Sequence, residues 1–307
     1  MIPYSLTQII FFFYCYCFIG WIIESTYVSV RTRKLTNRGF MRGPFIPIYG
    51  FGGLVMLLAG TPLLKWPVLV FFAGMISASA LEYVTGAAME AIFKVRYWDY
   101  SNEKFNLNGH ICLFTSICWG LLSVALDYFI HKPIESLSEM LMGKPLEAIV
   151  NIISIYFIVD LTLSFKAAFD LRSVIIKMEE AKEELRLMGR RIDVILALID
   201  DEKNQRLEKL GDTFEELNNN IEEGLNKIKS MLSERPDAIA DNIREEYEEF
   251  VKRLAVKRDN NTGLQSFREF YKRGIFLGNP TLNSKRFKDS VETIKKFIEE
   301  NRKNWDK

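Results

Sequence analysis

The chain is poor in the residues that build metal centres and nucleophilic sites. Its 307 residues include only 2 His and 4 Cys, and the four cysteines lie in apolar segments without zinc-finger or CxxC spacing. The lone histidines, His110 and His131, have no ligand cluster around them in the sequence. No Walker A loop, GxSxG or HExxH motif occurs. We therefore expect no metal, cofactor or nucleotide site and no enzyme activity, although a membrane enzyme acting on lipid stays open.

Net charge and strand patterns are also nearly absent. The formal net charge is +1, from 40 Lys and Arg against 39 Asp and Glu, so the chain lacks an electrostatic basis for binding nucleic acid. The amino terminus lacks the short basic head and small-residue cleavage site of a secretory signal peptide. No alternating pattern of any length indicates a β-strand. An all-α fold is what remains.

Long apolar runs fill the chain up to Leu171, and charged residues dominate from Arg172 onwards. A helix that crosses a bilayer needs about 20 apolar residues. The sequence therefore predicts an all-α polytopic membrane domain in residues 1–171, a long helix or coiled coil in 172–235 and a helical cytoplasmic tail in 236–307. The five predicted spans are about Gln8–Val30, Phe45–Leu64, Trp66–Phe93, Ile111–Ile130 and Leu146–Phe169. The turn between the second and third spans is very short, and one re-entrant unit is the alternative there.

Basic residues gather in the loops that follow the first and third spans. These residues are Arg31, Arg33, Lys34, Arg38 and Arg42 in one loop and Lys94, Arg96 and Lys104 in the other. The remaining two loops hold only Lys65, Lys132 and Lys144. The positive-inside rule then predicts that the two basic loops and the carboxyl terminus are cytoplasmic and that the amino terminus is outside.

Apolar residues continue beyond the last span in heptad spacing. They run from Leu185 to Ile199 and again from Leu207 to Ile221. This spacing favours a long helix that leaves the membrane and forms a coiled coil, with an antiparallel hairpin turning near 201–204 as the alternative. The heptads predict self-association or a protein partner through residues 172–235, or they only pack the tail helices on one another.

Acidic side chains stand inside the predicted spans, where each costs roughly 2.5–3.5 kcal/mol at a helix centre. The third span repeats a small or acidic residue at every fourth position, namely Gly74, Ala78, Glu82, Gly86 and Glu90. Small residues at this spacing let a neighbouring helix approach, so the acids on the same stripe should face protein instead of lipid. Glu24 lies at a similar predicted depth in the first span, and Asp160 lies near the middle of the fifth.

Two interpretations of these acids stay open. In the first, Glu24, Glu82 and Asp160 line a polar cavity that opens to the cytoplasm. In the second, Glu24 and Glu90 are interfacial and reach water, and only Glu82 and Asp160 are buried and paired. The candidate counter-charges are Arg38, Arg42 and Lys166.

The two basic loops are dense in polar and aromatic residues. Candidate functional residues in them are Asn37, Arg38, Trp98, Asp99 and Asn106. The aromatic side chains suit an interfacial belt, and the Arg, Asn and Asp beside them suit a grip on an anionic head group. Residue type alone does not separate these two readings.

Several short motifs occur in a fixed order along the chain. They are FIGWIIES (Phe18–Ser25), NRGF (Asn37–Phe40), GPFIPIYGFG (Gly43–Gly52), LEYVTG (Leu81–Gly86), WDYS (Trp98–Ser101) and FNLNGHICL (Phe105–Leu113). Together they resemble the putative ABC-transporter type IV family of CmpB-like permeases, over roughly residues 10 to 170. NPTLNSKRF (Asn279–Phe287) is similar to tail segments of the same family.

The resemblance implies a multi-pass protein of the bacterial plasma membrane, and it supplies no set of catalytic residues. The first functional hypothesis is a permease-like subunit that moves an unidentified solute or lipid. Since the chain has no nucleotide site, an ABC-type mechanism would need a separate ATPase subunit. The alternative is a membrane-anchored scaffold or sensor that acts through its cytoplasmic tail.

Overall fold

The structure is a computed structural model, and it describes residues 4–199 together with positions 275, 278, 279, 281–284, 286–289, 291, 292, 294 and 295. Within these residues the secondary structure is helical, apart from loops and two isolated β-bridges, Arg96 with Asn283 and Leu107 with Ile111. The all-α prediction is confirmed for this part of the chain. The heptads from Leu207 to Ile221, and with them the coiled coil, lie outside the described residues.

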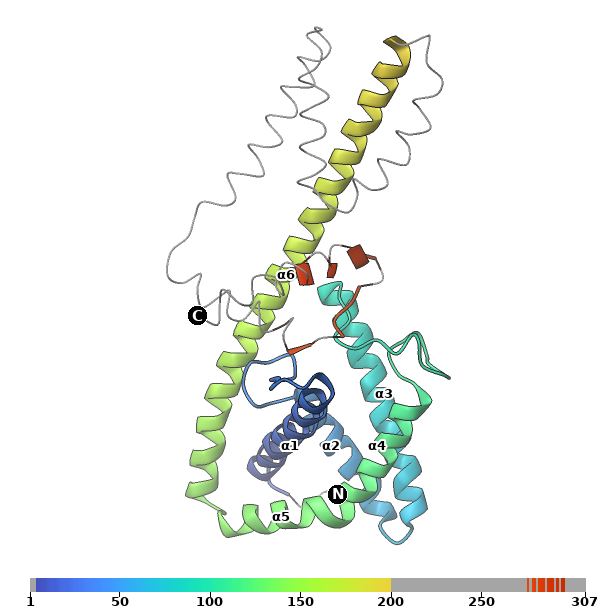
Figure 1. The fold of residues 1–307 in the computed structure, drawn as a ribbon. Coiled ribbons are helices and arrows are strands. Elements are labelled where there is room, and N and C mark those ends of the chain that lie inside the picture. Colours follow the sequence, from blue (N-terminus) through green and yellow to red (C-terminus); the bar gives the residue numbers. More distant parts are fainter. Residues whose placement is uncertain are drawn as a thin grey trace. The chain divides into compact units, whose positions relative to one another are not determined.

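Within the described residues, eight helical elements follow one another from Leu6 to Ile199 (Figure 1). They are α1 (Leu6–Thr32), α2 (Pro47–Gly60), the 3₁₀ turn η1 (Thr61–Leu63), α3 (Pro67–Phe93), α4 (Leu113–Ala125), the π-helical turn η2 (Leu126–Ile130), α5 (His131–Met140) and α6 (Lys144–Ile199). Figure 1 shows α5 lying across one end of the bundle, where it joins η2 to α6. The loops after α1 and α3 lie at the opposite end.

Among the residues that the structure describes, four stretches of helix are long and apolar enough to cross a membrane. They are Leu6–Thr32, Pro67–Phe93, Leu113–Met140 and the start of α6, within Lys144–Glu184. The outward faces of these helices carry large apolar side chains, such as Ile76 and Ile152, which are 65% and 69% exposed. Surfaces of this kind suit lipid. The chain is therefore a multi-pass membrane protein, as the sequence predicts.

The second predicted span is shorter than expected. The sequence predicts a helix over about Phe45–Leu64, whereas α2 begins at Pro47 and ends at Gly60, followed by one 3₁₀ turn. Ile46 is extended because a residue before proline is disfavoured in the helical region. At 1.5 Å per residue, the α-helical part is about 21 Å long, less than the roughly 30 Å of a hydrocarbon core.

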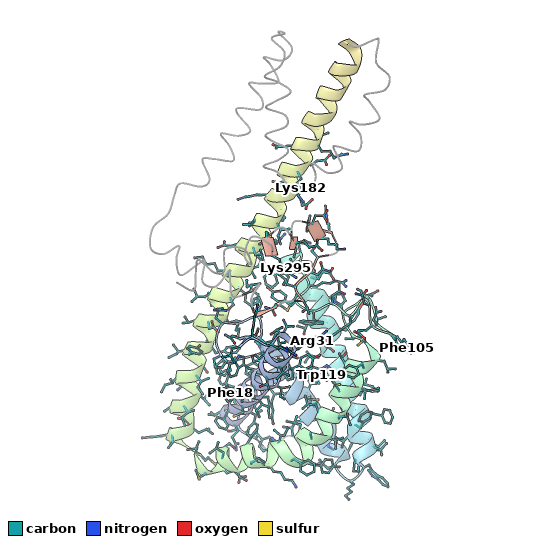
Figure 2. All side chains as sticks on the ribbon, in the orientation of Figure 1. Phe18, Arg31, Phe105, Trp119, Lys182 and Lys295 are labelled. Carbon is teal, nitrogen blue, oxygen red and sulfur yellow. The ribbon has the colours of Figure 1, made fainter. Side chains whose placement is uncertain are left out.

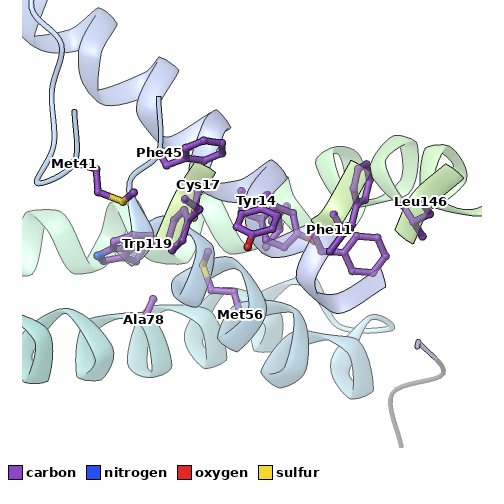
Figure 3. Close-up of a cluster of buried hydrophobic side chains, with 14 residues drawn as sticks. Phe11, Tyr14, Cys17, Met41, Phe45, Met56, Ala78, Trp119 and Leu146 are labelled. Atoms are coloured by element: carbon purple, nitrogen blue, oxygen red, sulfur yellow. The ribbon is translucent and has the colours of Figure 1, made fainter. Parts of the chain in front are cut away.

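The core lies between α1, α2 and their neighbours, and it is rich in aromatic rings (Figure 3). Phe12, Cys17 and Met56 are almost fully buried in it. Two glycines of α2 allow α1 to come close, since a Cβ on Gly50 would overlap Cys17 and one on Gly53 would overlap Tyr16. These glycines explain why the GPFIPIYGFG segment suits a closely packed helix.

The contacts divide the chain into two compact units, one of residues 1–172 and 268–286 and one of residues 173–267 and 287–307. Helix α6 continues without a break from the first unit into the second, as the sequence predicts for the end of the last span. In the second unit, Lys182 and Arg186 pair with Glu179 and Glu183 one turn earlier. The segment boundaries at 171, 172–235 and 236–307 stay predictions.

Candidate functional site

Two glutamates and three aromatic side chains from five different segments gather at the loop end of the bundle, where hydrogen bonds hold both carboxylates. This carboxylate cluster consists of Glu24 (α1), Tyr49 (α2), Glu82 (α3), Tyr100 (the α3–α4 loop) and Trp119 (α4). The Tyr49 hydroxyl donates to Glu24 Oε1 at 2.8 Å. Tyr100 donates to Glu82 Oε1 at 3.3 Å, and Trp119 Nε1 donates to Glu82 Oε2 at 2.9 Å.

Glu24 and Glu82 belong to one electrostatic group. Tyr49 connects them, because its hydroxyl is bonded to Glu24 and its ring lies 5.2 Å from that of Trp119, the donor to Glu82. Glu82 is 6% exposed, whereas the side chain of Glu24 is 33% exposed. The cluster thus runs from a buried carboxylate to one that is open to its surroundings.

The small-residue stripe of α3 faces protein, as predicted from its spacing. Gly74, Ala78, Glu82 and Gly86 are all buried. A Cβ on Gly74 would overlap the side chain of Ser123 on α4, so α3 and α4 approach closely at this point. Their close approach brings Trp119 within reach of Glu82 and shields both from lipid.

Arg38 supplies a cation at the exposed end of the cluster. Its Nε lies 3.7 Å from Glu24 Oε2, so the predicted counter-charge role of Arg38 holds for Glu24. The neighbouring Asn37 accepts a hydrogen bond from Trp21 Nε1 at 2.6 Å and donates to the carbonyl of Arg42 at 2.5 Å. These bonds fix the turn of the loop that presents Arg38.

Asp160 holds the same loop from α6. Its Oδ2 accepts a hydrogen bond from the backbone N–H of Gly43 at 2.8 Å, and the residue is 3% exposed. A side chain at position 43 would overlap Tyr156 and Asp160, so only glycine lets the loop come this close to α6. The structure thus brings Glu24 and Glu82 into one cluster and places Asp160 against the loop at Gly43.

A second charged group centres on Arg96, which in the sequence is only one of the basic residues that predict the topology. Its Nε donates to Glu90 Oε2 at 2.8 Å, and its Nη1 donates to Asp99 Oδ1 at 3.1 Å. His110 Nε2 lies 3.4 Å from the same Glu90 oxygen. Arg96 is 5% exposed, so this is a buried cation held by two carboxylates.

The electrostatics of this loop follow from those contacts. Burial by itself would raise the pKa of Asp99, but hydrogen bonds from Ser101 and Arg96 outweigh it and hold that pKa below its ordinary value. Burial by itself would lower the pKa of Arg96, but the hydrogen bonds and charges of Glu90 and Asp99 outweigh burial, so that pKa is raised. Burial raises the pKa of Tyr100, with the charges of Glu82 and Glu24 adding to the effect.

The α3–α4 loop turns at Gly109, where any other residue would strain the backbone. Gly109 has φ +77°, and a Cβ there would overlap Ser101, Arg96 and Asp99. Asn106 accepts a hydrogen bond from the Gly109 N–H at 3.1 Å, and Trp98 Nε1 donates to the carbonyl of His110 at 2.9 Å. The candidates Trp98, Asp99 and Asn106 therefore shape this loop. Phe105, 81% exposed, lies at its outer tip (Figure 2).

The distant NPTLNSKRF segment binds both loops. Arg38 Nη1 donates to Asn279 Oδ1 at 2.7 Å, and Asn279 Nδ2 donates to the carbonyl of Gly39 at 2.9 Å. The backbones of Arg96 and Asn283 exchange two hydrogen bonds of 2.7 and 3.0 Å. Thr281 and Ser284 donate to the carbonyls of Tyr97 and Lys94. The segment thus bridges the loop after α1 and the loop after α3.

Comparison with known proteins agrees with this arrangement. A family described as putative ABC-transporter type IV matches residues 11–165, half of the chain. The chain belongs to this family. No curated protein and no solved structure matches it. The match covers most of α1, all elements from α2 to α5 and the start of α6, and it therefore includes Glu24, Glu82 and Asp160.

Membership of the ABC-transporter type IV family makes this a membrane protein associated with transport. Tyr49, Tyr100 and Trp119 donate to the two glutamates, and of these three sequence reasoning missed Trp119. Tyr49 and Tyr100 do stand in motifs quoted for the resemblance, but Trp119 has no such signal. Only the packing of α4 on α3 shows that the indole reaches Glu82.

Proposed function

We propose that the chain is the permease-like integral membrane subunit of a transport system, and that a polar cavity near its cytoplasmic side forms around Glu24 and Glu82. The observation that supports this most directly is the setting of Glu82. It is a buried carboxylate inside a membrane helix, and the hydrogen bonds it accepts come from the neutral donors Tyr100 and Trp119. Polar groups are costly in this position and are retained there for function.

The chemistry of the cluster indicates what its ligand should carry. Within the described residues, the ion pairs of the structure include Arg38 with Glu24 but none with Glu82. A group with a positive charge or several N–H donors would compensate this carboxylate better than two neutral donors do. We infer a solute or lipid head group with a cationic or donor-rich moiety.

The energy source is proposed to lie in another protein. Because the chain has no Walker A motif, a separate ATPase subunit would bind and hydrolyse ATP, and this chain would not act as an enzyme. The basic loops after α1 and α3 are proposed to face the cytoplasm of a bacterium, with the amino terminus outside the plasma membrane. The partner would then dock on the loop face or on the tail.

The decisive experiment compares variants of one glutamate in cells. A strain without the protein would be complemented with the wild type, Glu82→Gln or Glu103→Gln, at matched expression. Glu103 is an exposed glutamate of the α3–α4 loop and serves as the control. Untargeted profiling of metabolites and lipids, in cells and in medium, should show the same accumulated compound in the deletion strain and in Glu82→Gln.

Two outcomes would contradict the proposal. One is a Glu82→Gln profile that matches the wild type while the deletion strain differs. The other is a deletion strain with no change in any transported compound. Purification of the intact complex from native membranes, with mass spectrometry of bound proteins and lipids, would test the ATPase partner separately.

A scaffold or sensor role has one specific observation in its favour. Helix α6 runs for 56 residues as one element, from the last membrane segment into a charged extension. This role predicts that deleting residues 205–307 abolishes the phenotype while Glu82→Gln retains it. The permease proposal predicts that Glu82→Gln loses it.

A further inference from the structure

A second polar group lies at the other end of the bundle, where α5 crosses it. The Tyr4 hydroxyl lies 2.6 Å from Glu135 Oε1 and 3.0 Å from His131 Nε2. On the other side of the ring, His131 Nδ1 lies 2.7 Å from the hydroxyl of Tyr16. Glu135 and Tyr4 are partly exposed, whereas His131 and Tyr16 are 5% and 3% exposed. The four side chains thus form a continuous path from the surface into the protein.

The hydrogens of this path point one way. Tyr4 has one hydroxyl hydrogen, and it donates it to Glu135, so its oxygen accepts from His131 Nε2. A neutral imidazole that donates through Nε2 accepts through Nδ1, and the donor to Nδ1 is Tyr16. Every donor therefore faces Glu135, and the oxygen of Tyr16 keeps its capacity to accept a hydrogen bond from deeper in the protein.

A buried aspartate without a hydrogen-bond partner stands about one helical turn before His131. Asp127 is 5% exposed, and neither of its carboxyl oxygens has a hydrogen-bond partner within the part of the chain that the structure describes. It stands four residues before His131 in the π-helical turn η2, and its charge acts on the hydroxyl of Tyr16. Turns of this kind are rare and occur often at functional sites.

The surroundings of Asp127 favour its neutral form. The elements packed against η2 include α2 and α4, and neither Pro47–Gly60 nor Leu113–Ala125 contains Asp, Glu, Lys, Arg or His. Its Oδ2 lies where a Cβ on Gly60 would be, against the backbone of α2. Helix α5 also packs against η2 and carries His131, Lys132, Glu135 and Glu139, of which Lys132 is exposed. From α1, Tyr16 is the titratable group on which the charge of Asp127 acts. None of the ion pairs in the described part of the chain includes Asp127, so an ionised carboxylate would be uncompensated.

We propose that Asp127 is a buried proton-binding site and that Tyr16, His131 and Tyr4 exchange its proton with Glu135. In the first step of this transfer, the side chain of Asp127 changes rotamer, and its carboxyl then reaches the hydroxyl of Tyr16. The carboxyl O–H proton passes to Tyr16 as the hydroxyl proton of Tyr16 passes to His131 Nδ1. The Nε2 proton passes to Tyr4, and the Tyr4 hydroxyl proton passes to the carboxylate of Glu135. Each intermediate group keeps its number of protons, and His131 changes tautomer.

This site differs from the carboxylate cluster in place and in residues, so it does not depend on the proposed permease function. Its ligand is the proton. A chain of hydroxyl and imidazole groups passes protons by hydrogen-bond exchange but offers no ligand cluster for a metal ion. A membrane protein with such a site can respond to the proton concentration on the side where Glu135 lies.

Isotope-edited infrared spectroscopy of the full chain in lipid nanodiscs tests the site directly. With carbon-13 in the aspartate carboxyls, the wild type should show a protonated aspartic-acid carbonyl band at neutral pH, and Asp127→Asn should lack it. After transfer to D₂O, Tyr4→Phe and Tyr16→Phe should keep the band but slow its hydrogen–deuterium exchange by at least about tenfold. The matched control is Tyr128→Phe, since Tyr128 lies in the same turn and bonds the carbonyl of Leu64.

Four results would overturn the proposal. The first is a wild type without a protonated aspartate band, and the second is a band that persists in Asp127→Asn. The third is an exchange rate in Tyr4→Phe and Tyr16→Phe equal to that of Tyr128→Phe. The fourth is an Asp127→Asn variant that does not fold, because a neutral amide should replace a neutral acid at this position. If Asp127→Asn folds with an unchanged or higher melting temperature, this result supports a protonated Asp127 in the wild type.

Discussion

Arg38 and Asn279 are hydrogen-bonded at 2.7 Å although 241 positions separate them in the chain. The same guanidinium lies 3.7 Å from Glu24 of the carboxylate cluster. A segment near the carboxyl end is thus tied, through a single arginine, to an acid in the first membrane helix. Access to the cluster and the docking of this segment should therefore depend on each other.

The first prediction concerns this tie. Asn279→Ala removes the acceptor for Arg38 and the donor to the carbonyls of Gly39 and Ile275. Leaving such partners unsatisfied costs about 1–3 kcal/mol each when they are buried. Hydrogen–deuterium exchange should accelerate in the loop around Gly39. The control variant is Asn108→Ala, because Asn108 is exposed and donates a hydrogen bond to the hydroxyl of Tyr83. Equal exchange in both variants would show that Asn279 does not hold its segment on the loop around Gly39.

The second prediction concerns the buried cation of the α3–α4 loop. Arg96→Gln leaves Glu90 and Asp99 without their shared partner, and removal of one member of a buried ion pair costs about 3–5 kcal/mol. The melting temperature should fall clearly. Arg31→Gln is the control, because Arg31 is exposed and its Nη1 donates to the hydroxyl of Tyr27 at 3.3 Å. A melting temperature as high as that of the control would contradict a stabilising role for Arg96.

The third prediction is a pH dependence of the same loop. The pKa of Asp99 is lowered in the folded protein, so its contribution to stability is complete above the ordinary carboxyl pKa and is lost as pH falls through the folded value. Local exchange in residues 96–110 should therefore rise in acid below the ordinary range of an aspartate. Asp99→Asn should remove this dependence. A pH profile that is the same in both proteins would assign the acid response to another group.

The fourth prediction concerns helix packing below the cluster. A Cβ on Gly20 would overlap the ring of Tyr49, whereas one on Gly52 would meet Trp119 at an ordinary 3.5 Å. Overpacking of a tight core costs about 1–3 kcal/mol. Gly20→Ala should lower the melting temperature and disturb the bond from Tyr49 to Glu24, and Gly52→Ala should change little. If the double variant Gly20→Ala/Tyr49→Ala regains part of the lost melting temperature, the loss in Gly20→Ala comes from the overlap with Tyr49. A double variant as unstable as Gly20→Ala would argue against this explanation.

The sequence by itself determined the membrane helices and the burial of the α3 stripe. Length and apolar content set the boundaries of α1 and α3 to within a few residues, because a membrane span must satisfy its own backbone. The repeat from Gly74 to Gly86 indicated a face against protein, since small and acidic residues gain nothing from lipid. The second span, predicted over about Phe45–Leu64, is a shorter apolar helix over Pro47–Leu63. Pro47 begins this helix, and its last turn is a 3₁₀ turn, two local features that hydropathy does not measure.

Only the tertiary structure decided which polar groups meet. Glu24 and Glu82 were candidates from their burial cost, but their donors Tyr49, Tyr100 and Trp119 come from separate segments. Hydropathy records that a tyrosine or tryptophan is apolar and does not record where its one polar atom points. The same holds for His131, which looks isolated in the sequence yet joins Tyr4 to Tyr16. Pairings between distant segments depend on how helices cross, and no spacing within one helix contains that information.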